Sequence, residues 1–267
     1  MTAPEPLRTG RGIGIDGCPG GWAAVVIEGS TDESAVVALQ SFVYPDIASL
    51  WAGLRPDAAR DRVWIDMPIG LAEGADGIRN RLEDRHCDRD CRTLLPKWRK
   101  SSVFPVPARQ ALRAEDPSAA NEAAIGRRLS RQSLNILPKI REVDDFVYER
   151  LENGCPAAGL PQESHPELAF LRLNAGEAPR SGKKEAEGRR QRIDILVRAG
   201  MAPEELERLL QRFPRKQAAP DDLLDAAALA LGAWRVASGQ SPVRCVTEGE
   251  RRQYDYDGHL EINIAYL

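Results

Sequence analysis

Four aspartates are placed where they could together form a reactive site. Asp16 and Asp66 each follow a short apolar run typical of a β-strand. Asp222 and Asp225 stand at the start of a long Ala- and Leu-rich stretch typical of a helix. Residues three apart share one helix face, with Cβ atoms about 5–6 Å apart. Crowded carboxylates repel one another, and a hard divalent cation relieves that cost, so the four aspartates predict a site for Mg²⁺ or Mn²⁺.

A carboxylate site of this kind implies a definite chemistry. Two divalent ions about 3.5–4 Å apart can activate a water molecule and stabilise the leaving oxygen when a phosphodiester bond is cleaved. We therefore expect an enzyme, a metal-dependent hydrolase, with Asp16, Asp66, Asp222 and Asp225 as metal ligands. Each aspartate alone has a plainer explanation, because an Asp often forms a turn after a strand or caps a helix. The occurrence of all four in this order is what indicates a site.

Glu167 and its neighbours form a second candidate group. Glu167 could be a further catalytic carboxylate that binds metal or orients water, and His165 could contact the substrate or act as a general acid or base. The alternative is that Pro166 occupies the first turn of a helix, with Glu167 complementing the helix dipole and His165 on the surface. The position near the predicted strand ends favours a function.

Two basic runs are candidates for binding phosphate in a chain that is acidic overall. Lys183, Lys184 and Arg189 lie between Glu167 and the last acidic pair, and we expect them to contact substrate phosphates. A second run, from Arg85 to Arg109, contains Trp98, which could stack on an unpaired base or belong to the core. Such runs are often only solvated helix faces, and that alternative stays open.

The sequence of strands explains how the first two aspartates meet. Apolar runs on either side of the turn Gly17–Gly21 predict a β-hairpin, and Ala35–Tyr44 predicts a third strand. A short helix over Asp46–Leu54 leads to a fourth strand, Arg62–Asp66, which the helical crossover makes parallel to the first. Ligands of open α/β sheets bind at the carboxyl ends of the strands, where Asp16 and Asp66 are expected to meet.

The remaining signals complete one α/β domain over residues 12–267, after a flexible N-terminus at 1–11. A helical insertion spans about 71–159 after the fourth strand and holds helices opened by Asp116-Pro117 and over Leu137–Leu151. A short fifth strand follows near 162–164, then helices near 182–199, 202–213 and 220–238, and a β-hairpin in the tail with Asp257-Gly258 near its turn. The predicted fold is a mixed sheet, three antiparallel strands and then parallel strands, flanked by helices.

Composition narrows the class of protein. The 267 residues are 42% hydrophobic and 29% charged, which is enough to build a core. The net charge of −3 excludes a wholly basic nucleic-acid coat. No apolar run reaches about 18 residues and the N-terminus lacks an apolar signal core, so no membrane span or secretion is expected. Five scattered cysteines, an odd number, indicate reduced thiols and a cytoplasmic protein.

A series of motifs runs along most of the chain, from Gly12 to about Gly239. They are Gly14–Trp22, Ile65–Leu71, Asp88 with Arg92, Ser102–Pro105 with Pro107, Gln132 with Lys139-Ile140, Val143-Asp144, His165–Glu167, Lys183-Lys184 with Glu187–Arg189, and Asp222–Ala226. In this order they resemble the predicted ribonuclease-H-like nucleases of domain of unknown function 429. The last motif is also similar to the final helix of Holliday-junction resolvases. The resemblance implies a ribonuclease-H-like fold and a nuclease activity, but it supplies no particular substrate.

Three functions are compatible with these observations. The first is a nuclease that cleaves phosphodiester bonds of nucleic acid with Mg²⁺ or Mn²⁺. The second is an ATPase or kinase of the actin-like class, which would need a second phosphate loop and a second comparable domain. The third is a non-catalytic scaffold or regulatory protein with the same fold, against which the intact acidic set speaks.

Overall fold

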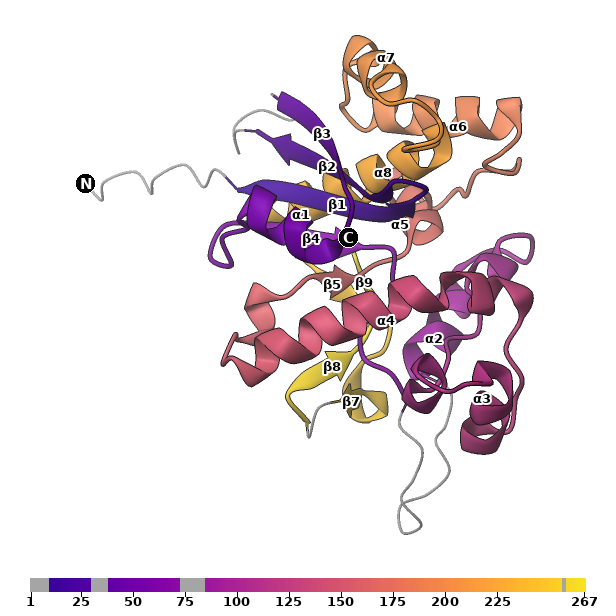
Figure 1. Ribbon diagram of the computed structural model, residues 1–267. Coiled ribbons are helices and arrows are strands. Elements are labelled where there is room, and N and C mark those ends of the chain that lie inside the picture. The colour runs from indigo at the N-terminus through magenta and orange to yellow at the C-terminus, as the bar shows by residue number, and fades with distance from the viewer. Residues whose placement is uncertain (1–9, 30–37, 73–84, 256–257) are drawn as a thin grey trace. The chain divides into compact units, whose positions relative to one another are not determined.

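The structure is a computed structural model that describes residues 10–29, 38–72, 85–255 and 258–267 (Figure 1). Most of the predicted N-terminal segment, the first residues of the predicted third strand and Asp257 of the predicted tail turn lie outside these ranges. By the density of its internal contacts the chain divides into two compact units. The first unit comprises Met1–Asp66, Ser164–Arg244 and Tyr266–Leu267, and the second comprises Met67–Glu163 and Cys245–Ala265. The single domain over 12–267 stays a prediction.

The central sheet has the strand order β3-β2-β1-β4-β5. Its strands are β1 (Arg11–Cys18), β2 (Gly21–Glu28), β3 (Ala38–Tyr44), β4 (Arg62–Ile65) and β5 (Gln162–Glu163). The first three strands are antiparallel neighbours, and β4 runs parallel to β1 with Ile15 opposite Ile65. The predicted mixed sheet, with helices flanking it, is confirmed. The predicted fourth strand was one residue too long, because β4 ends at Ile65.

Two short connections set the geometry of this sheet. The β1–β2 turn is tight: Gly21 has φ +120°, and a Cβ there would lie 2.2 Å from the carbonyl oxygen of Tyr44. Glycine is therefore required here by the positive φ and by the close approach of the end of β3. The helix α1 (Ile47–Leu54) carries the crossover from β3 to β4, and Asp46 caps it by accepting the Ser49 N–H at 2.7 Å.

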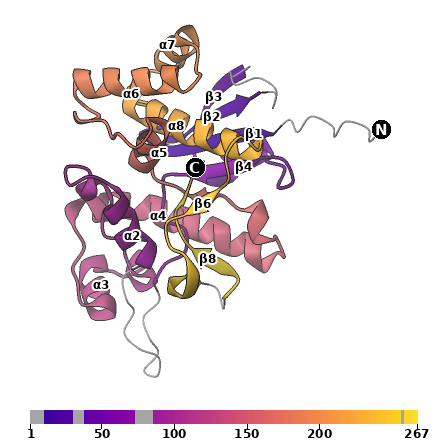
Figure 2. The same ribbon diagram turned by 180° about the vertical axis from the view of Figure 1, so that it is seen from behind.

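The long helix α8 (Pro220–Ala237) packs directly on β1. Gly12 and Gly14 lie on one face of β1, two residues apart, and a Cβ on either would lie within 2.2 Å of the helix backbone at Ala226 or Ala230. Gly14 lies against Ala226 and Gly12 lies against Ala230, so the helix runs in the opposite direction to β1. The start of α8 therefore lies over the carboxyl end of β1. Figure 2 shows α8 beside the strands with α5 and α6 next to it.

Three further helices complete the first unit. They are α5 (Pro166–Leu173), α6 (Ala186–Arg198) and α7 (Pro203–Gln211). The helices predicted near 182–199, 202–213 and 220–238 are all present, and the first begins four residues later than expected, at Ala186. The segment ahead of it, which includes Lys183, is therefore a loop and not a helix face.

The second unit contains most of the predicted helical insertion. Its helices are α2 (His86–Leu94), α3 (Pro117–Ile125) and α4 (Arg131–Glu152), with the short 3₁₀ turns η1 (Lys100–Ser102), η2 (Arg109–Leu112), η3 (Ala157–Gly159) and η4 (Gly249–Arg251). Asp116 caps α3 as predicted. The prediction for α4 was wrong at its start, because Ser130 caps the helix and the chain continues as helix through Pro138.

The C-terminal segment forms two small sheets instead of one hairpin. The pair β7 (Gln253–Asp255) and β8 (Leu260–Ile262) is antiparallel, as predicted for the hairpin, whereas β6 (Arg244–Cys245) pairs with β9 (Ala265–Tyr266).

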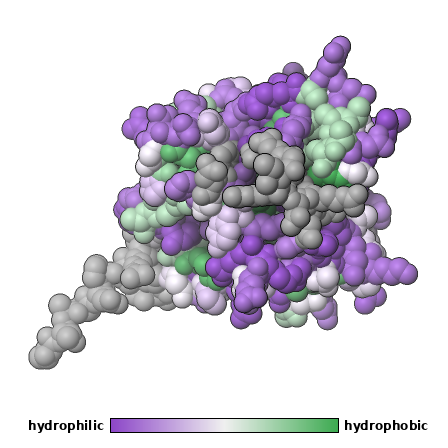
Figure 3. Space-filling model, turned by 90° about the horizontal axis from the view of Figure 1, so that it is seen from below, coloured by the Kyte–Doolittle hydropathy of each residue, from purple (hydrophilic) through white to green (hydrophobic). Residues whose placement is uncertain are grey.

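The surface agrees with the charged composition. Hydrophilic side chains dominate the face drawn in Figure 3, and hydrophobic ones form small separate areas. Within the described ranges no helix is both long and apolar enough to cross a bilayer.

Candidate active site

Asp16 and Asp66 are neighbours at the carboxyl ends of parallel strands. Asp66 continues the ladder beyond β4 by donating its N–H to the Ile15 carbonyl at 2.9 Å, so it stands in register with Asp16. Asp16 is only 7% exposed and lies on the face of β1 that α8 covers. No residue in the described part of the chain donates a hydrogen bond to either carboxylate. Asp66 is half-buried, so the hydrogen bonds that these two carboxylates need can come from water or from a ligand.

Asp225 joins these two aspartates from the second turn of α8. It is 2% exposed, and its Oδ2 accepts a hydrogen bond from the ammonium of Lys183 at 2.7 Å. Lys183 comes from the loop before α6, and its side chain is 39% exposed. The close packing of α8 on Gly12 and Gly14 brings Asp225 to this end of the sheet. The structure thus gathers three of the four predicted metal ligands and one predicted phosphate contact.

Asp222 has a more local role. Its Oδ2 accepts the Ala219 N–H at 2.9 Å, which satisfies a backbone donor at the start of α8. The alternative of a helix cap therefore applies to Asp222. It still belongs to the electrostatic neighbourhood of the site, because its charge contributes to the raised pKa of Asp16.

Burial dominates the electrostatics of the three inner aspartates. It raises the pKa of Asp16 well above its ordinary value, and the charges of Asp66 and Asp225 raise it further. Burial likewise raises the pKa of Asp66, and it raises that of Asp225 to about 6 although Lys183 opposes the shift. Burial alone would lower the pKa of Lys183, but the three carboxylates raise it above its ordinary value. Lys183 is the cation that all three aspartates share.

His165 and Glu167 lie at the edge of this cluster, and the structure shows the helix start that was the alternative for them, whereas their catalytic role stays a prediction. Pro166 opens α5, and His165 caps the helix through Nδ1, which accepts the Glu167 N–H at 3.2 Å. A positive charge on His165 would lower the pKa of Asp66. Glu167 is buried, and its charge raises the pKa of Asp66 and of Asp225.

Arg192 lies in the same basic stretch as Lys183, and the sequence interpretation missed its partner. Its guanidinium is fully buried and forms an ion pair with Glu167. A signal was present, because Gly188, Arg192 and Ile195 form a buried stripe on α6 at helical spacing. An arginine on such a stripe needs a carboxylate partner, and Glu167 is that partner.

The three predicted phosphate contacts separate in the structure. Lys183 lies on Asp225, whereas Lys184 is exposed and Arg189 is half-buried on α6. The sequence grouped them because they are close along the chain, but the loop turns into α6 between Lys184 and Arg189.

The carboxylate oxygens are suitable ligands for a hard metal ion, but the described side chains are not positioned around a metal site. Oxygen donors are the ligands that Mg²⁺ and Mn²⁺ prefer. Within the described ranges, however, no three His, Cys, Asp or Glu side chains are arranged to hold a metal ion. In this structure the positive charge beside the Asp225 carboxylate is the ammonium of Lys183.

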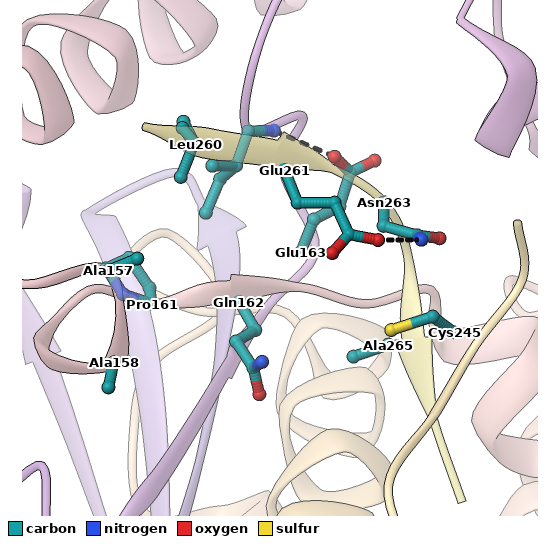
Figure 4. Close-up of a pocket in the computed structure, with 11 residues that line it drawn as sticks. Ala157, Ala158, Pro161, Gln162, Glu163, Cys245, Leu260, Glu261, Asn263 and Ala265 are labelled. Atoms are coloured by element: carbon teal, nitrogen blue, oxygen red, sulfur yellow. Dashed lines mark hydrogen bonds between the residues drawn. The ribbon is translucent and has the colours of Figure 1, made fainter. Parts of the chain in front are cut away.

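The second unit also buries charged residues, in a different setting. Arg109 forms ion pairs with Asp144 and Asp255, and Arg85 forms one with Glu163 at 2.5 Å. Glu163 also lines a pocket of about 230 Å³ with Glu261 and Asn263, drawn in Figure 4. The Asn263 amide donates to Glu261 at 2.7 Å, and the Ile69 N–H donates to Glu163 at 2.8 Å. The polar side chains Glu163, Glu261 and Asn263 of this pocket therefore already have hydrogen-bond partners within the second unit.

Trp98 is on the surface of the second unit and does not belong to the core. Its side chain is 58% exposed, whereas the other four tryptophans are buried. Lys97 and Lys100, both exposed, lie next to it in sequence.

Comparison with known proteins identifies the family of this chain. No curated protein and no solved structure matches the chain. A family model described as "Protein of unknown function (DUF429)" matches residues 14–251, a range that includes every residue of the acidic site. The chain therefore belongs to the DUF429 family.

Proposed function

We propose that this protein is a divalent-metal-dependent nuclease with a ribonuclease-H-like fold, which hydrolyses phosphodiester bonds of nucleic acid at the site of Asp16, Asp66, Asp222 and Asp225. The observation that carries the proposal is the pair Asp16 and Asp66. Both carboxylates lie at the carboxyl ends of neighbouring strands, and neither accepts a hydrogen bond from the described residues. An arrangement of this kind favours an external ligand with positive charge.

The energetic argument follows from charge balance. Three buried or half-buried carboxylates face the single ammonium of Lys183. Removing carboxylates from water costs several kcal/mol per ion unless they are paired. A fold that keeps this excess of negative charge is expected to recover the cost by binding cations.

Each residue has a role that its position supports. Bound Mg²⁺ or Mn²⁺ would supply activation of the attacking water and stabilisation of the leaving oxygen. Asp16, Asp66 and Asp225 would hold the metal, and Asp222 would keep the start of α8 in place while adding negative charge. Arg192 fixes Glu167 beside the cluster, and the Nε2 of His165 is the atom left to move a proton once Nδ1 caps α5.

The partner and the compartment belong to the same proposal. The substrate is nucleic acid, and the scattered cysteines fit the reduced cytoplasm.

The experiment is a panel of single-stranded, duplex and branched DNA and RNA, incubated with Mg²⁺, with Mn²⁺ and with a chelator. Cleavage of at least one substrate with metal, and none with chelator, is expected. The Asp66→Asn variant, purified in the same way, should cleave nothing, which excludes a contaminating nuclease. Cleavage that survives in Asp66→Asn, or no cleavage of any substrate, would contradict the proposal.

A further inference from the structure

We infer that Lys183 is the resident counter-ion of the acidic site, and that its ammonium must leave Asp225 before a divalent cation can bind there. The inference rests on the proposed function for the identity of the incoming cation. It accounts for two observations together: the carboxylates have the right chemistry for a metal, and the described side chains are not arranged to hold one.

The ion pair between Lys183 and Asp225 is short and lies in the middle of the acidic site. The Lys183 Nζ lies 2.7 Å from the Asp225 Oδ2, and Asp225 is almost fully buried. The ammonium also acts on Asp16 and Asp66. A divalent cation that binds these carboxylates would therefore compete with Lys183 for the same oxygen atoms.

The loop that carries Lys183 is firmly held up to the residue before it. The Gln191 side chain accepts the N–H groups of Arg180 and Ser181 at 2.9 and 3.1 Å. The Arg192 guanidinium donates to the Ser181 carbonyl at 3.3 Å. These contacts fix the backbone at the start of the loop and tie it to α6.

A glycine makes this anchoring possible. A Cβ on Gly188 of α6 would lie 1.9 Å from the Gly182 carbonyl oxygen, so any other residue there would push the loop away. Lys183 follows Gly182 directly, and its side chain is a flexible four-carbon stem. The ammonium can therefore move off Asp225 while its backbone stays in place.

A displaced Lys183 would remain at the rim of the site as a free cation. Its side chain is already 39% exposed, so it has access to solvent and to a bound anion. The same residue thus neutralises the empty site and becomes available to a substrate phosphate once another cation has replaced it. This gives a physical reason why a phosphate-binding lysine lies on a carboxylate.

The first test measures the affinity for Mn²⁺ alone by calorimetry, in the absence of substrate. Lys183→Met keeps the length of the side chain and removes its charge, so Mn²⁺ should bind at least about tenfold more tightly than to the wild type. Lys184→Met changes the exposed neighbour and is the matched control, with an unchanged affinity. Equal or weaker binding by Lys183→Met would overturn the inference and leave the proposed nuclease standing. Absence of Mn²⁺ binding in every protein would instead overturn the proposed function, and the inference with it.

The second test uses the wild type, so it does not depend on the folding of a variant. Acetylation of each lysine by acetic anhydride is followed by mass spectrometry with and without Mn²⁺. Lys183 should react faster when Mn²⁺ is present, and Lys184 should react at the same rate in both conditions. A Lys183 rate that is unchanged or slower with Mn²⁺ would show that the ammonium stays on Asp225.

Discussion

The two units of this molecule both bury carboxylates, but they treat them differently. In the second unit Asp144 and Asp255 share the guanidinium of Arg109, and Asp255 also accepts the Leu71 N–H at 2.8 Å. In the first unit Asp16 and Asp66 accept no hydrogen bond from the described residues, and the cation they share with Asp225 is one lysine.

The difference separates a cluster whose carboxylates are satisfied by the described residues of the fold from one whose carboxylates are not. An arginine has a planar fork that satisfies carboxylate oxygens in fixed positions, whereas a lysine is a compact charge on a flexible stem. The carboxylates around Arg109 are satisfied without a ligand, and their ion pairs join segments that are far apart along the second unit. The cluster around Lys183 is incomplete, so it is the place where a ligand would lower the free energy.

The largest expected effect is on the stability of the second unit. Arg109→Met leaves two buried carboxylates without their guanidinium, and breaking such a pair costs about 3–5 kcal/mol. Urea unfolding should show this loss. Arg113→Met is the control, because the Arg113–Asp145 pair is exposed and should contribute less than about 1 kcal/mol. A loss of equal size in both variants would mean that burial does not distinguish the clusters.

Asp16→Asn should have the opposite pattern, with a large effect on activity and little on stability. Nuclease activity is expected to fall by about 10²–10³-fold or more, because a charge that acts on the reacting atoms is lost. The folded protein without metal should be as stable as the wild type or more stable, since one buried charge is removed. Asp46→Asn, at the exposed cap of α1, is the matched control and should keep full activity. A destabilised and fully active Asp16→Asn would reverse the comparison.

The meeting of Asp16 and Asp66 could be predicted from the sequence, because it depends on the order of strands and helices. Asp16 and Asp66 follow apolar strands, and a helical crossover makes those strands parallel, so their meeting follows from topology. The spacing of Gly12, Gly14 and Asp16 also places all three on one face of a strand, although the sequence interpretation did not use it. The hairpin around Gly17–Gly21 and the short helix over Asp46–Leu54 needed no information beyond a few neighbouring residues.

The remaining features depend on contacts between distant residues. The contact of Lys183 with Asp225 depends on how α6 packs beside α8, and the pair of Arg192 with Glu167 depends on how α6 packs beside α5. The helix α4 continues through Pro138 because its buried side chains, among them Ile140, Val143 and Phe146, offset the cost of a proline inside a helix. Sequence patterns predict which face is buried, but not which partner a buried charge will find.

A smaller effect is expected in the pH dependence of stability. Burial raises the pKa of Asp225 to about 6 in the folded protein, from the ordinary value of 3.8. Between these values the folded state binds more protons than the unfolded state, so this contribution to stability falls as the pH rises from about 4 to 6. Its size is at most about 3 kcal/mol. The free energy of unfolding of the wild type minus that of Asp225→Asn, measured without metal, should therefore decrease over this range. A difference that increases with pH would mean that folding lowers the pKa of Asp225 instead of raising it.

The last prediction concerns what the second unit contributes if the chemistry belongs to the first. Trp98 is 58% exposed beside the exposed Lys97 and Lys100, a combination suited to stacking on an unpaired base while neutralising phosphate. Because the other four tryptophans are buried, quenching of tryptophan fluorescence by a single-stranded oligonucleotide should come from Trp98. Quenching should disappear in Trp98→Phe, and Trp98→Ala should weaken binding by about 1–3 kcal/mol for one stacked base.

The measurement is made with Asp16→Asn as the parent protein and with chelator, so that nothing is cleaved. Tyr254→Ala removes another exposed aromatic side chain of the same unit and should leave both quenching and affinity unchanged. If quenching persists in Trp98→Phe, the oligonucleotide alters a buried tryptophan instead, and Trp98 is only an exposed residue of the surface.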